Sequence, residues 1–438
     1  MKSSYDVIVI GGGPSGTAAA VGAAQSGADT LLVERAGYLG GMATDAKIPA
    51  FCPFTDGQQL LVGGVGLKIL RDMQAEMWRS PFYDHKPGRR FEDDWVPIDT
   101  EVLKRVLDRL LIQSGCDLAL HTALVSAETR GRQLCSVTLL TPGGLRTVTG
   151  QVFVDCTGSA ALAMAAGHPC ECGDEQGRVQ AATLCFQVAN FDTRRFLAYA
   201  EAEDEDGNLH KACAKARQEG NFPAGETQVA GIALTTPGTA TLNFGHVFDF
   251  DPFSAEGMTA AECQARQALP ELMRFLHHYV PGAEQAVLVG SGPGIGIRES
   301  RRIVADYTLT RQDYNARADF PDCIGHYAYP IDLHASTQAT GHLTGHADYE
   351  TSRYQPGEHY GIPYRSLVAR DLDNLLAAGR IIGSDRAMQG SVRVMPACFL
   401  TGQAAGTAAA LCAQQGSDTH HMDPATVRDG LRAQGAIV

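Results

Sequence analysis

The stretch YDVIVIGGGPSGTAAAVGAAQSGADTLLVER, residues 5–35, decides the fold of this chain. Residues 5–10 form a nearly continuous β-branched run, which is typical of a strand in a parallel sheet that is covered on both faces. A glycine-rich turn and an alanine-rich segment, from about Ser15 to Ser26, follow that run. A second apolar run, Thr30–Val33, then ends in an acidic residue. The spacing predicts a complete β-α-β unit.

Each glycine of this unit has its own structural role. Gly11 permits the tight turn, Gly13 lets the backbone approach a pyrophosphate, and Gly16 lets the helix pack closely on the sheet. Pro14 and Ser15 stand where the helix opens, and the unpaired N–H groups of a helix N-terminus attract phosphate. With strand, turn and helix in the required order, the sequence predicts a dinucleotide site.

The nature of the dinucleotide follows from more distant segments. Glu34, which can accept hydrogen bonds from a ribose, begins the segment 34–44 (ERAGYLGGMAT). This segment resembles the extended fingerprint of the FAD-linked flavoproteins related to glutathione reductase and fumarate reductase. Residues 155–158 match the strand-to-loop motif of that group, and residues 374–380 and 401–410 resemble its second FAD motif.

This resemblance implies an α/β protein with a Rossmann-like FAD-binding domain, and it leaves open whether FAD is held covalently. It also implies that the last of these motifs starts a helix, Thr401–Ala413, whose N-terminus points at the flavin. The residues expected to contact FAD are Gly11, Gly13, Pro14, Ser15, Gly16, Glu34, Arg35, Gly41, Met42, Ala43, Thr44, Val125, Thr157, Gly158, Gly379, Arg380, Arg393, Gly402 and Ala404.

The amino-acid composition of the chain differs between its two ends and its middle. Residues 167–363 carry most of the His, Asp, Tyr and Pro residues, whereas the segments on either side read as strands and helices of the nucleotide-binding type. We therefore expect a discontinuous FAD-binding domain, residues 1–166 and 364–438. An inserted mixed α+β substrate or cap domain, residues 167–363, completes the expected architecture.

Three further motifs carry a closer resemblance. They are Gly296–Ile303 (GIRESRRI), Tyr329–His334 (YPIDLH) and Ile362–Leu367 (IPYRSL). With the cofactor motifs, they make the whole chain resemble the bacterial FAD-dependent oxidoreductase family. The resemblance implies redox chemistry in a cleft between the two domains, but it does not specify a substrate.

Candidate catalytic residues come from these motifs. A histidine is the usual proton acceptor near neutral pH, which makes His334 the first candidate and His246 the second. Asp332 can orient His334, and both histidines have the alternative of a structural position at the domain interface. Arg298 and Arg302 are candidates for binding an anionic group, or, with Glu299, for a buried ion network.

A second glycine-rich run, residues 290–296, imitates a nucleotide fingerprint. A true fingerprint requires a helix immediately after it, but the GIRESRRI motif follows here. We expect a glycine-rich strand that faces the flavin rather than a second site for NAD(P).

The functions consistent with these motifs fall into three classes. The first is an oxidoreductase that transfers a hydride between flavin N5 and a small polar substrate, for which an anionic group is one option. The second is a flavin-dependent monooxygenase or halogenase. Halogenases of this type carry a W-x-W-x-I-P segment that the two tryptophans, Trp78 and Trp95, do not form. The third is a flavoprotein subunit with an electron-transfer or non-redox role.

The composition of the chain excludes several classes of binding partner. The net charge of −13 argues against a general nucleic-acid partner, and no apolar run is long enough to predict a membrane span. The twelve cysteines include no C-x-x-C pair, and Cys170 and Cys172 form the one tight pair, so we predict no metal site and expect reduced thiols in the cytoplasm. A homo-oligomer is left open.

Overall fold

The computed structural model describes residues 1–78, 91–205, 207–224, 226, 229–338 and 345–438. Its main sheet has the order β5-β2-β1-β8-β7-β6, and β19 pairs with the second half of β8. The strands of this sheet are β1 (Ser4–Ile10), β2 (Thr30–Val33), β5 (Asp117–Ala119), β6 (Ala123–Arg130), β7 (Gln133–Thr141), β8 (Gly144–Asp155) and β19 (Leu375–Ala377).

The nucleotide-binding half of the sheet is parallel. In the register of the strands, Ile10 lies opposite Val33 on one side and Asp155 on the other, and Ala377 lies opposite Asp155. The carboxyl ends of the central strands therefore meet at one edge, which is where open α/β sheets bind ligands. The predicted α/β class, Rossmann-like unit and strands β1 and β2 are confirmed.

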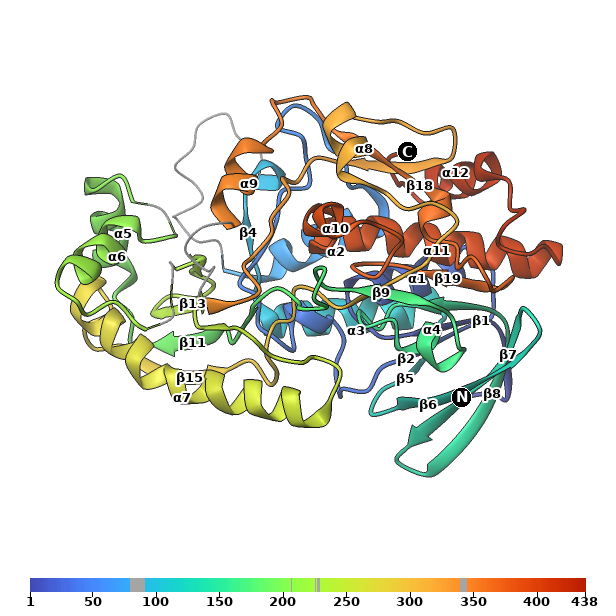
Figure 1. Ribbon diagram of the computed structural model, residues 1–438, viewed down its shortest axis with the longest axis horizontal. Coiled ribbons are helices and arrows are strands. Elements are labelled where there is room, and N and C mark those ends of the chain that lie inside the picture. The colour runs from blue at the N-terminus through green and yellow to red at the C-terminus, as the bar shows by residue number, and fades with distance from the viewer. Residues whose placement is uncertain (79–90, 206, 225, 227–228, 339–344) are drawn as a thin grey trace.

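Two helices cover this half of the sheet and cross each other closely (Figure 1). Their close approach places small residues against backbone, as the alanine-rich sequences predict. The helices of the chain are α1 (Pro14–Gln25), α2 (Gly64–Glu76), α3 (Thr100–Ser114), α4 (Ala161–Ala165), α5 (Thr193–Ala202), α6 (His210–Gln218), α7 (Ala255–Tyr279), α8 (Arg311–Ala316), α9 (Gly345–Thr351), α10 (Arg386–Val392), α11 (Met395–Gln415) and α12 (Pro424–Ala433); α1 and α11 are the crossing pair.

A second unit lies at the left end of Figure 1. A four-stranded antiparallel sheet of order β12-β13-β11-β15 packs there with α5, α6 and α7, and a short pair, β10 and β14, adjoins it. The strands are β10 (Ala182–Thr183), β11 (Phe186–Ala189), β12 (Gly231–Ala233), β13 (Thr239–Asn243), β14 (His246–Val247) and β15 (Val287–Ser291). Mixed α+β structure was the expectation for this part of the chain.

The remaining strands form short pairs. Strand β9 (Cys170–Cys172) pairs with β16 (Arg301–Ile303), β17 (Cys323–Tyr327) with β18 (Tyr360–Pro363), and β3 (Ala50–Phe51) with β4 (Val96–Pro97). Among the described residues, 3-10 turns are formed by η1 (Gly41–Ala43), η3 (Phe91–Asp93) and η5 (Tyr364–Ser366).

The apolar core bears on the domain boundaries. One buried cluster is drawn from residues 182–295, whereas Leu309, Ile331 and Ile362 pack in the same cluster as α1 and α11. Packing thus associates much of 305–363 with the FAD-binding part. The division at residues 166/167 and 363/364 stays a prediction.

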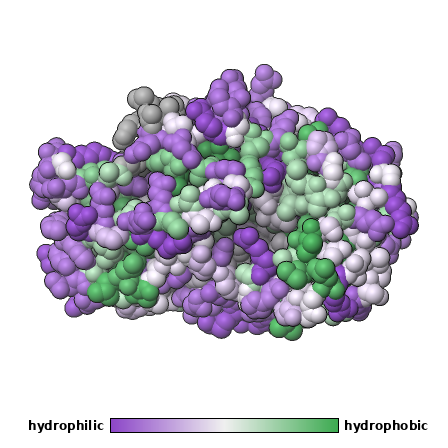
Figure 2. Space-filling view, turned by 60° about the horizontal axis from the view of Figure 1, so that its bottom comes forward, coloured by the Kyte–Doolittle hydropathy of each residue, from purple (hydrophilic) through white to green (hydrophobic). Residues whose placement is uncertain are grey.

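In the described part of the chain, no single helix is long and apolar enough to cross a membrane, although the bent pair α10 and α11 passes that test by length and composition together. Figure 2 shows apolar residues on one face gathered in separate patches with polar residues between them.

Candidate active site and cofactor cleft

The phosphate loop, residues 11–16, joins β1 to α1. Its glycines let a ligand approach the main chain directly. Gly11 has a φ of +101°, and a Cβ there would lie 2.5 Å from the Cys156 carbonyl oxygen. A Cβ at Gly16 would lie 1.7 Å from the Gly11 carbonyl oxygen, so only glycine permits this contact. Around Gly13, by contrast, the nearest atom to such a Cβ is 3.8 Å away. The loop therefore has the bare, open backbone that a pyrophosphate requires.

Pro14 and Ser15 form the first turn of α1, where proline's missing N–H costs no hydrogen bond. Glu34 follows β2, and its carboxylate accepts hydrogen bonds from the Gly12 and Ala36 amides, both at 2.7 Å. These bonds fix the acid at the end of β2, beside the phosphate loop, which is the position required for ribose binding.

The next predicted segment also closes on the phosphate loop. Gly41, Met42 and Ala43 form the 3-10 turn η1, and a Cβ at Gly41 would lie 2.8 Å from the Gly13 Cα. Thr44 ends the turn and donates its hydroxyl to the Leu39 carbonyl at 2.7 Å. The segment predicted from the FAD fingerprint therefore packs directly over the loop.

The loops after β8 and β19 complete this edge. Asp155 is fully buried and accepts from the Thr157 amide and hydroxyl, at 2.9 and 2.7 Å, which shapes the turn into Gly158. Arg380, directly after Gly379, donates to the carbonyls of Gly158 at 2.6 Å and Ile297 at 2.7 Å. The guanidinium group thereby ties three separate loops together at the carboxyl edge.

A row of positive charges runs along this edge. Burial, with the charges of Arg393 and the exposed Arg35, lowers the pKa of Arg380 to about 10. Burial and Arg393 likewise lower the pKa of Arg298 to about 10. The like charges of Arg298, Arg380 and Arg393 together favour an anionic ligand at this edge.

One arginine has an unused donor. Arg393 Nη2 donates to the Asp332 carboxylate at 2.9 Å, but its Nε is buried and has no hydrogen-bond partner among the residues that the structure describes. Buried donors are rarely left unpaired, so this atom indicates a missing ligand. With the glycine cradle and the arginine row, these residues fit a flavin dinucleotide, which they would hold at its diphosphate and close to its ring.

The helix expected to start at Thr401 starts earlier, so that expectation is wrong. Helix α11 begins at Met395, because Pro396 is tolerated in a first turn. Gly402 and Ala404 consequently lie inside the helix, and a Cβ at Gly402 would lie 2.1 Å from the Ser15 carbonyl oxygen. What the geometry gives Gly402 is close packing of α11 against α1.

Val125 lies on β6 with about half of its surface exposed. Its expected contact with the adenine, like the other expected contacts with the cofactor, stays a prediction.

The predicted catalytic residues converge beside Arg393. His334 Nε2 lies 3.3 Å from Asp332 Oδ1, and the ring of His334 lies 5.8 Å from the ring of His246. His246 Nδ1 in turn lies 2.8 Å from Glu226 Oε2. We call these residues, with Arg298 and Arg393, the His334 cluster.

Strand pairing explains how distant residues meet in the cluster. Strand β10 pairs with β14 so that Thr183 lies opposite His246, and Arg298 Nη1 donates to the Thr183 hydroxyl at 2.7 Å. The His334 amide donates to Gln180 Oε1 at 2.9 Å. Gln180 and Glu226 had no signal in the sequence, because each takes its role from pairing between residues far apart in the chain.

Electrostatics set the protonation of the cluster. Burial and the charge of Arg298 lower the pKa of His334 to about 3, against the opposite effect of Asp332. Burial alone would raise the pKa of Asp332, but His334 and Arg393 hold it well below its usual range. At neutral pH the cluster therefore contains a neutral histidine beside an ionised carboxylate.

Arg302 has a different environment. Its Nη1 lies 3.3 Å from Glu299 Oε1, and its Nε donates to the Ser384 carbonyl at 2.9 Å. Arg386 Nε and the Gln180 amide also donate to the fully buried Glu299. This arrangement corresponds to the buried ion network that the sequence left open as the alternative to anion binding.

The glycine-rich run at 290–296 continues from β15, and no helix follows within residues 292–300, all of which are described. This agrees with the interpretation that the run is not a second nucleotide fingerprint.

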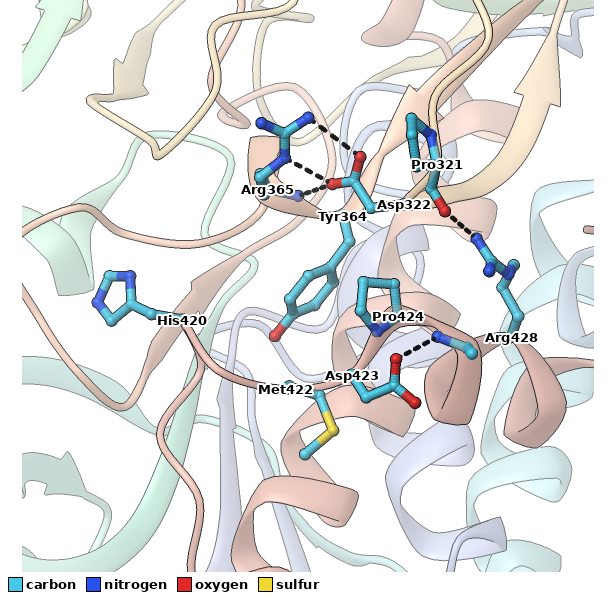
Figure 3. Close-up of a pocket in the computed structure, with 10 residues that line it drawn as sticks. Pro321, Asp322, Tyr364, Arg365, His420, Met422, Asp423, Pro424 and Arg428 are labelled. Carbon is cyan, nitrogen blue, oxygen red and sulfur yellow. Dashed lines mark hydrogen bonds and ion pairs between the residues drawn. The ribbon is translucent and has the colours of Figure 1, made fainter.

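A surface pocket elsewhere has paired charges. Figure 3 shows Arg365 bonded to Asp322, and Asp423 accepting from an amide of α12. The contacts among its lining residues give it no evident ligand group, so the candidate active site remains at the His334 cluster.

Replacing Glu34 with alanine should weaken FAD binding roughly 10- to 100-fold, which corresponds to about one charge-assisted hydrogen bond. Quenching of flavin fluorescence on titration measures the dissociation constant. Glu175→Ala, an exposed acid in a loop, is the matched control and should leave it unchanged. Equal affinities for the two variants would contradict a ribose-binding role for Glu34.

Comparison with known proteins agrees with this geometry. The family model described as "FAD dependent oxidoreductase" matches residues 6–431. A digeranylgeranylglycerophospholipid reductase from Methanocella arvoryzae is 28% identical over 173 residues, which span 36% of this chain and 40% of the relative's own length.

Solved structures are similar to this chain at low sequence identity. A flavin-dependent brominase, Bmp2, has a TM-score of 0.51 and 14% identity, with 97% of this chain and 83% of that chain covered. A geranylgeranyl bacteriochlorophyll reductase-like protein from Thermoplasma acidophilum has a TM-score of 0.46 and 12% identity, with 98% and 83% covered. The family match over nearly the whole chain, with a glycine-rich loop and buried arginines suited to its cofactor, shows that this protein is an enzyme of the FAD-dependent oxidoreductase family.

Proposed function

We propose that the enzyme transfers a hydride between a small polar substrate and N5 of FAD, at the His334 cluster. The observation that carries this proposal is the convergence of His334, Asp332 and Arg393 at the edge where the FAD motifs meet. When bound, FAD supplies the two-electron acceptor or donor. The chain's own residues then have to hold the substrate and move its proton.

His334 is suited to take that proton. It is neutral at pH 7, and Asp332, on its Nε2 side, orients the ring and stabilises the imidazolium that forms. A pKa of about 3 makes His334 a weak base in the free protein, because burial and, after it, the charge of Arg298 oppose protonation. A negative charge on the substrate, close to Arg298, would raise that pKa toward the neutral range.

This argument favours an anionic substrate. Arg298 and Arg393 supply two guanidinium groups to the cluster, and the carboxylate of Asp332 already bonds to one of them. A substrate carboxylate or phosphate would neutralise the charge of the other guanidinium group, that of Arg298. The same negative charge would raise the pKa of His334, so that it could accept the proton. Such a device couples substrate binding to proton transfer.

The test is anaerobic reduction of the bound flavin, followed by its absorbance near 450 nm, with a panel of carboxylates, phosphates and their neutral analogues. Bleaching by anionic metabolites supports the proposal. Bleaching by neutral polyols alone would overturn the anionic assignment, and bleaching by NADH or NADPH alone would favour a reductase or a monooxygenase.

His334→Asn should slow reduction by the active substrate about 10²- to 10⁴-fold without loss of FAD, because it removes the proton acceptor. His278→Asn, on the exposed side of α7, is the control.

The pH dependence of the wild-type rate provides a second prediction. At low substrate concentration the rate reflects the ionisation of the free enzyme. It should not decline on acidification through pH 6.5, because the pKa of His334 is about 3. A titration near pH 6.5 would assign the base to another group.

Secondary assignments are also proposals. All twelve cysteines are unpaired thiols, which supports a cytoplasmic location. The alternative of a monooxygenase or halogenase, or of an electron-transfer subunit, is separated by the same flavin reduction experiment. A homo-oligomer remains a prediction for size-exclusion chromatography with light scattering.

A further inference from the structure

A second group of reactive side chains lies at the start of β17 and shares no residue with the His334 cluster. His326 Nε2 lies 3.3 Å from Asp319 Oδ1 and 3.7 Å from Cys323 Sγ. The three atoms all lie within 4.8 Å of one another. They present one oxygen, one sulfur and one nitrogen to a common point.

The two separations from His326 Nε2 match edges of a coordination tetrahedron. Zinc bonds to sulfur, nitrogen and oxygen at about 2.3, 2.05 and 2.0 Å, so tetrahedral angles place a sulfur and a nitrogen ligand about 3.6 Å apart and a nitrogen and an oxygen ligand about 3.3 Å apart. The observed distances of 3.7 and 3.3 Å differ from these by no more than a tenth of an ångström. Little movement would be needed to accept the ion.

The backbone is irregular where the ligands require it. In a regular strand, residues three apart such as Cys323 and His326 point to opposite faces. The pairing of β17 with β18 shifts register between these two residues, at a point where Gly325 has a φ of +148°. The irregularity turns both side chains to one side, as β-bulges do near functional sites.

Residues other than the three candidate ligands fix the turn that carries Asp319 and Cys323. Asp322 accepts from Arg365 Nε at 3.0 Å and Nη2 at 3.2 Å, a contact that Figure 3 shows. Across the strand pair, a Cβ at Gly361 would lie 3.0 Å from both Asp319 Oδ1 and Cys323 Sγ. The backbone thus approaches the ligand atoms closely and leaves them no room to spread.

A neighbouring histidine holds the ring of His326. His359 packs edge-on against it, with ring centroids 4.9 Å apart, and His359 Nδ1 lies 3.0 Å from the buried carboxylate of Asp56. This packing restricts the orientation of the His326 ring.

We propose that Asp319, Cys323 and His326 bind a divalent transition-metal ion of the zinc class, with a fourth ligand from solvent on the side where Asp319 is exposed. A mixed set of thiolate, imidazole and carboxylate is suited to zinc rather than to magnesium or calcium. The thiol proton passes to solvent when the thiolate binds the ion. The spacing D-x₃-C-x₂-H was the signal in the sequence, although we predicted no metal site there for lack of a C-x-x-C pair.

The holoenzyme, loaded with zinc and dialysed against a weak chelator, should retain about one zinc ion per chain by elemental analysis. Cys323→Ser and His326→Ala should lose it while keeping their FAD. Matched controls are Cys263→Ser and His210→Ala, which change exposed residues and should retain the ion. Retention by the double variant of Cys323 and His326, or no retention by the wild type, would overturn the proposal.

Cobalt provides a readout that does not depend on stability. Co²⁺ in the wild type should give the intense visible bands of a tetrahedral site, at wavelengths longer than the flavin absorption, and Cys323→Ser should abolish them. Weak octahedral bands, or unchanged bands in Cys323→Ser, would contradict a thiolate-containing site.

Discussion

Replacing Glu299 with glutamine should lower the free energy of unfolding by about 3–5 kcal/mol, because it leaves the buried Arg302 and the half-buried Arg386 without their counter-charge. Glu299 is fully buried, and its carboxylate accepts from Arg386 Nε at 3.0 Å and faces Arg302 Nη1 at 3.3 Å. The side chain of Arg302 is 5% exposed, so water cannot replace the lost partner there. A calorimetric scan of the FAD-loaded protein should show a melting temperature several degrees lower.

Glu171→Gln makes a suitable control, since Glu171 is exposed and lies directly opposite Arg302 in the β9–β16 pairing. The change there should be within about 0.5 kcal/mol. A double variant, Glu299→Gln with Arg302→Gln, should cost less than the sum of the single changes, because the residues share one network. Additive costs would show that Glu299 and Arg302 act independently.

The same substitution should reach the His334 cluster. The Gln180 amide donates to Glu299 at 2.9 Å, and Gln180 Oε1 accepts from the His334 amide at 2.9 Å. Loss of the carboxylate therefore loosens the residue that positions the backbone of His334. We expect slower flavin reduction by the active substrate in Glu299→Gln, with FAD still bound.

The sequence was most informative where local pattern decides structure. Strand β2 has the predicted bounds, and α1 opens at Pro14 and Ser15, as the phosphate-loop pattern predicted. Gly16 could be assigned because the contact that requires glycine is with the Gly11 carbonyl oxygen, five residues away in the same turn. Such features depend on few neighbours, all of them close in the chain.

Tertiary packing set the limits of that prediction. The start of α11 was misplaced because Met395–Leu400 carries no small-residue signal, although the structure buries that turn as fully as the rest of the helix. His246 and His334 were separate candidates, and their meeting depends on β10 pairing with β14 and on Gln180. Neither contact has a periodic signature.

Replacing Gly402 with alanine should disrupt both folding and FAD binding, since a Cβ there would lie 2.1 Å from the Ser15 carbonyl oxygen. The obstacle is backbone at the first turn of α1, so the two helices have to move apart. We expect a loss of at least about 3 kcal/mol in stability, at or beyond the upper end of usual overpacking costs.

A graded series makes this prediction sharp. Gly406→Ala should be as severe, because its Cβ would lie 1.9 Å from the Ala19 carbonyl oxygen, whereas Gly22→Ala, with a closest approach of 2.9 Å to the Gln403 carbonyl oxygen, should cost less. Gly416→Ser meets no atom within 4 Å but has a φ of +61°, so it reports backbone strain without overpacking. Soluble yield, FAD content and melting temperature should follow the order of these distances.

The two effects of Gly402→Ala can be separated by position along the crossing. Ser15 belongs to the phosphate loop, whereas Ala19 lies one turn farther into α1. Separation of α1 from α11 at Ser15 should displace the phosphate loop and so weaken FAD binding. Gly402→Ala should therefore lose more FAD affinity than Gly406→Ala when the two variants lose the same stability. Equal FAD affinities in the two variants would mean that α11 supports the fold as a whole rather than the phosphate loop in particular. Wild-type stability in either variant would show that α1 and α11 are not packed this closely.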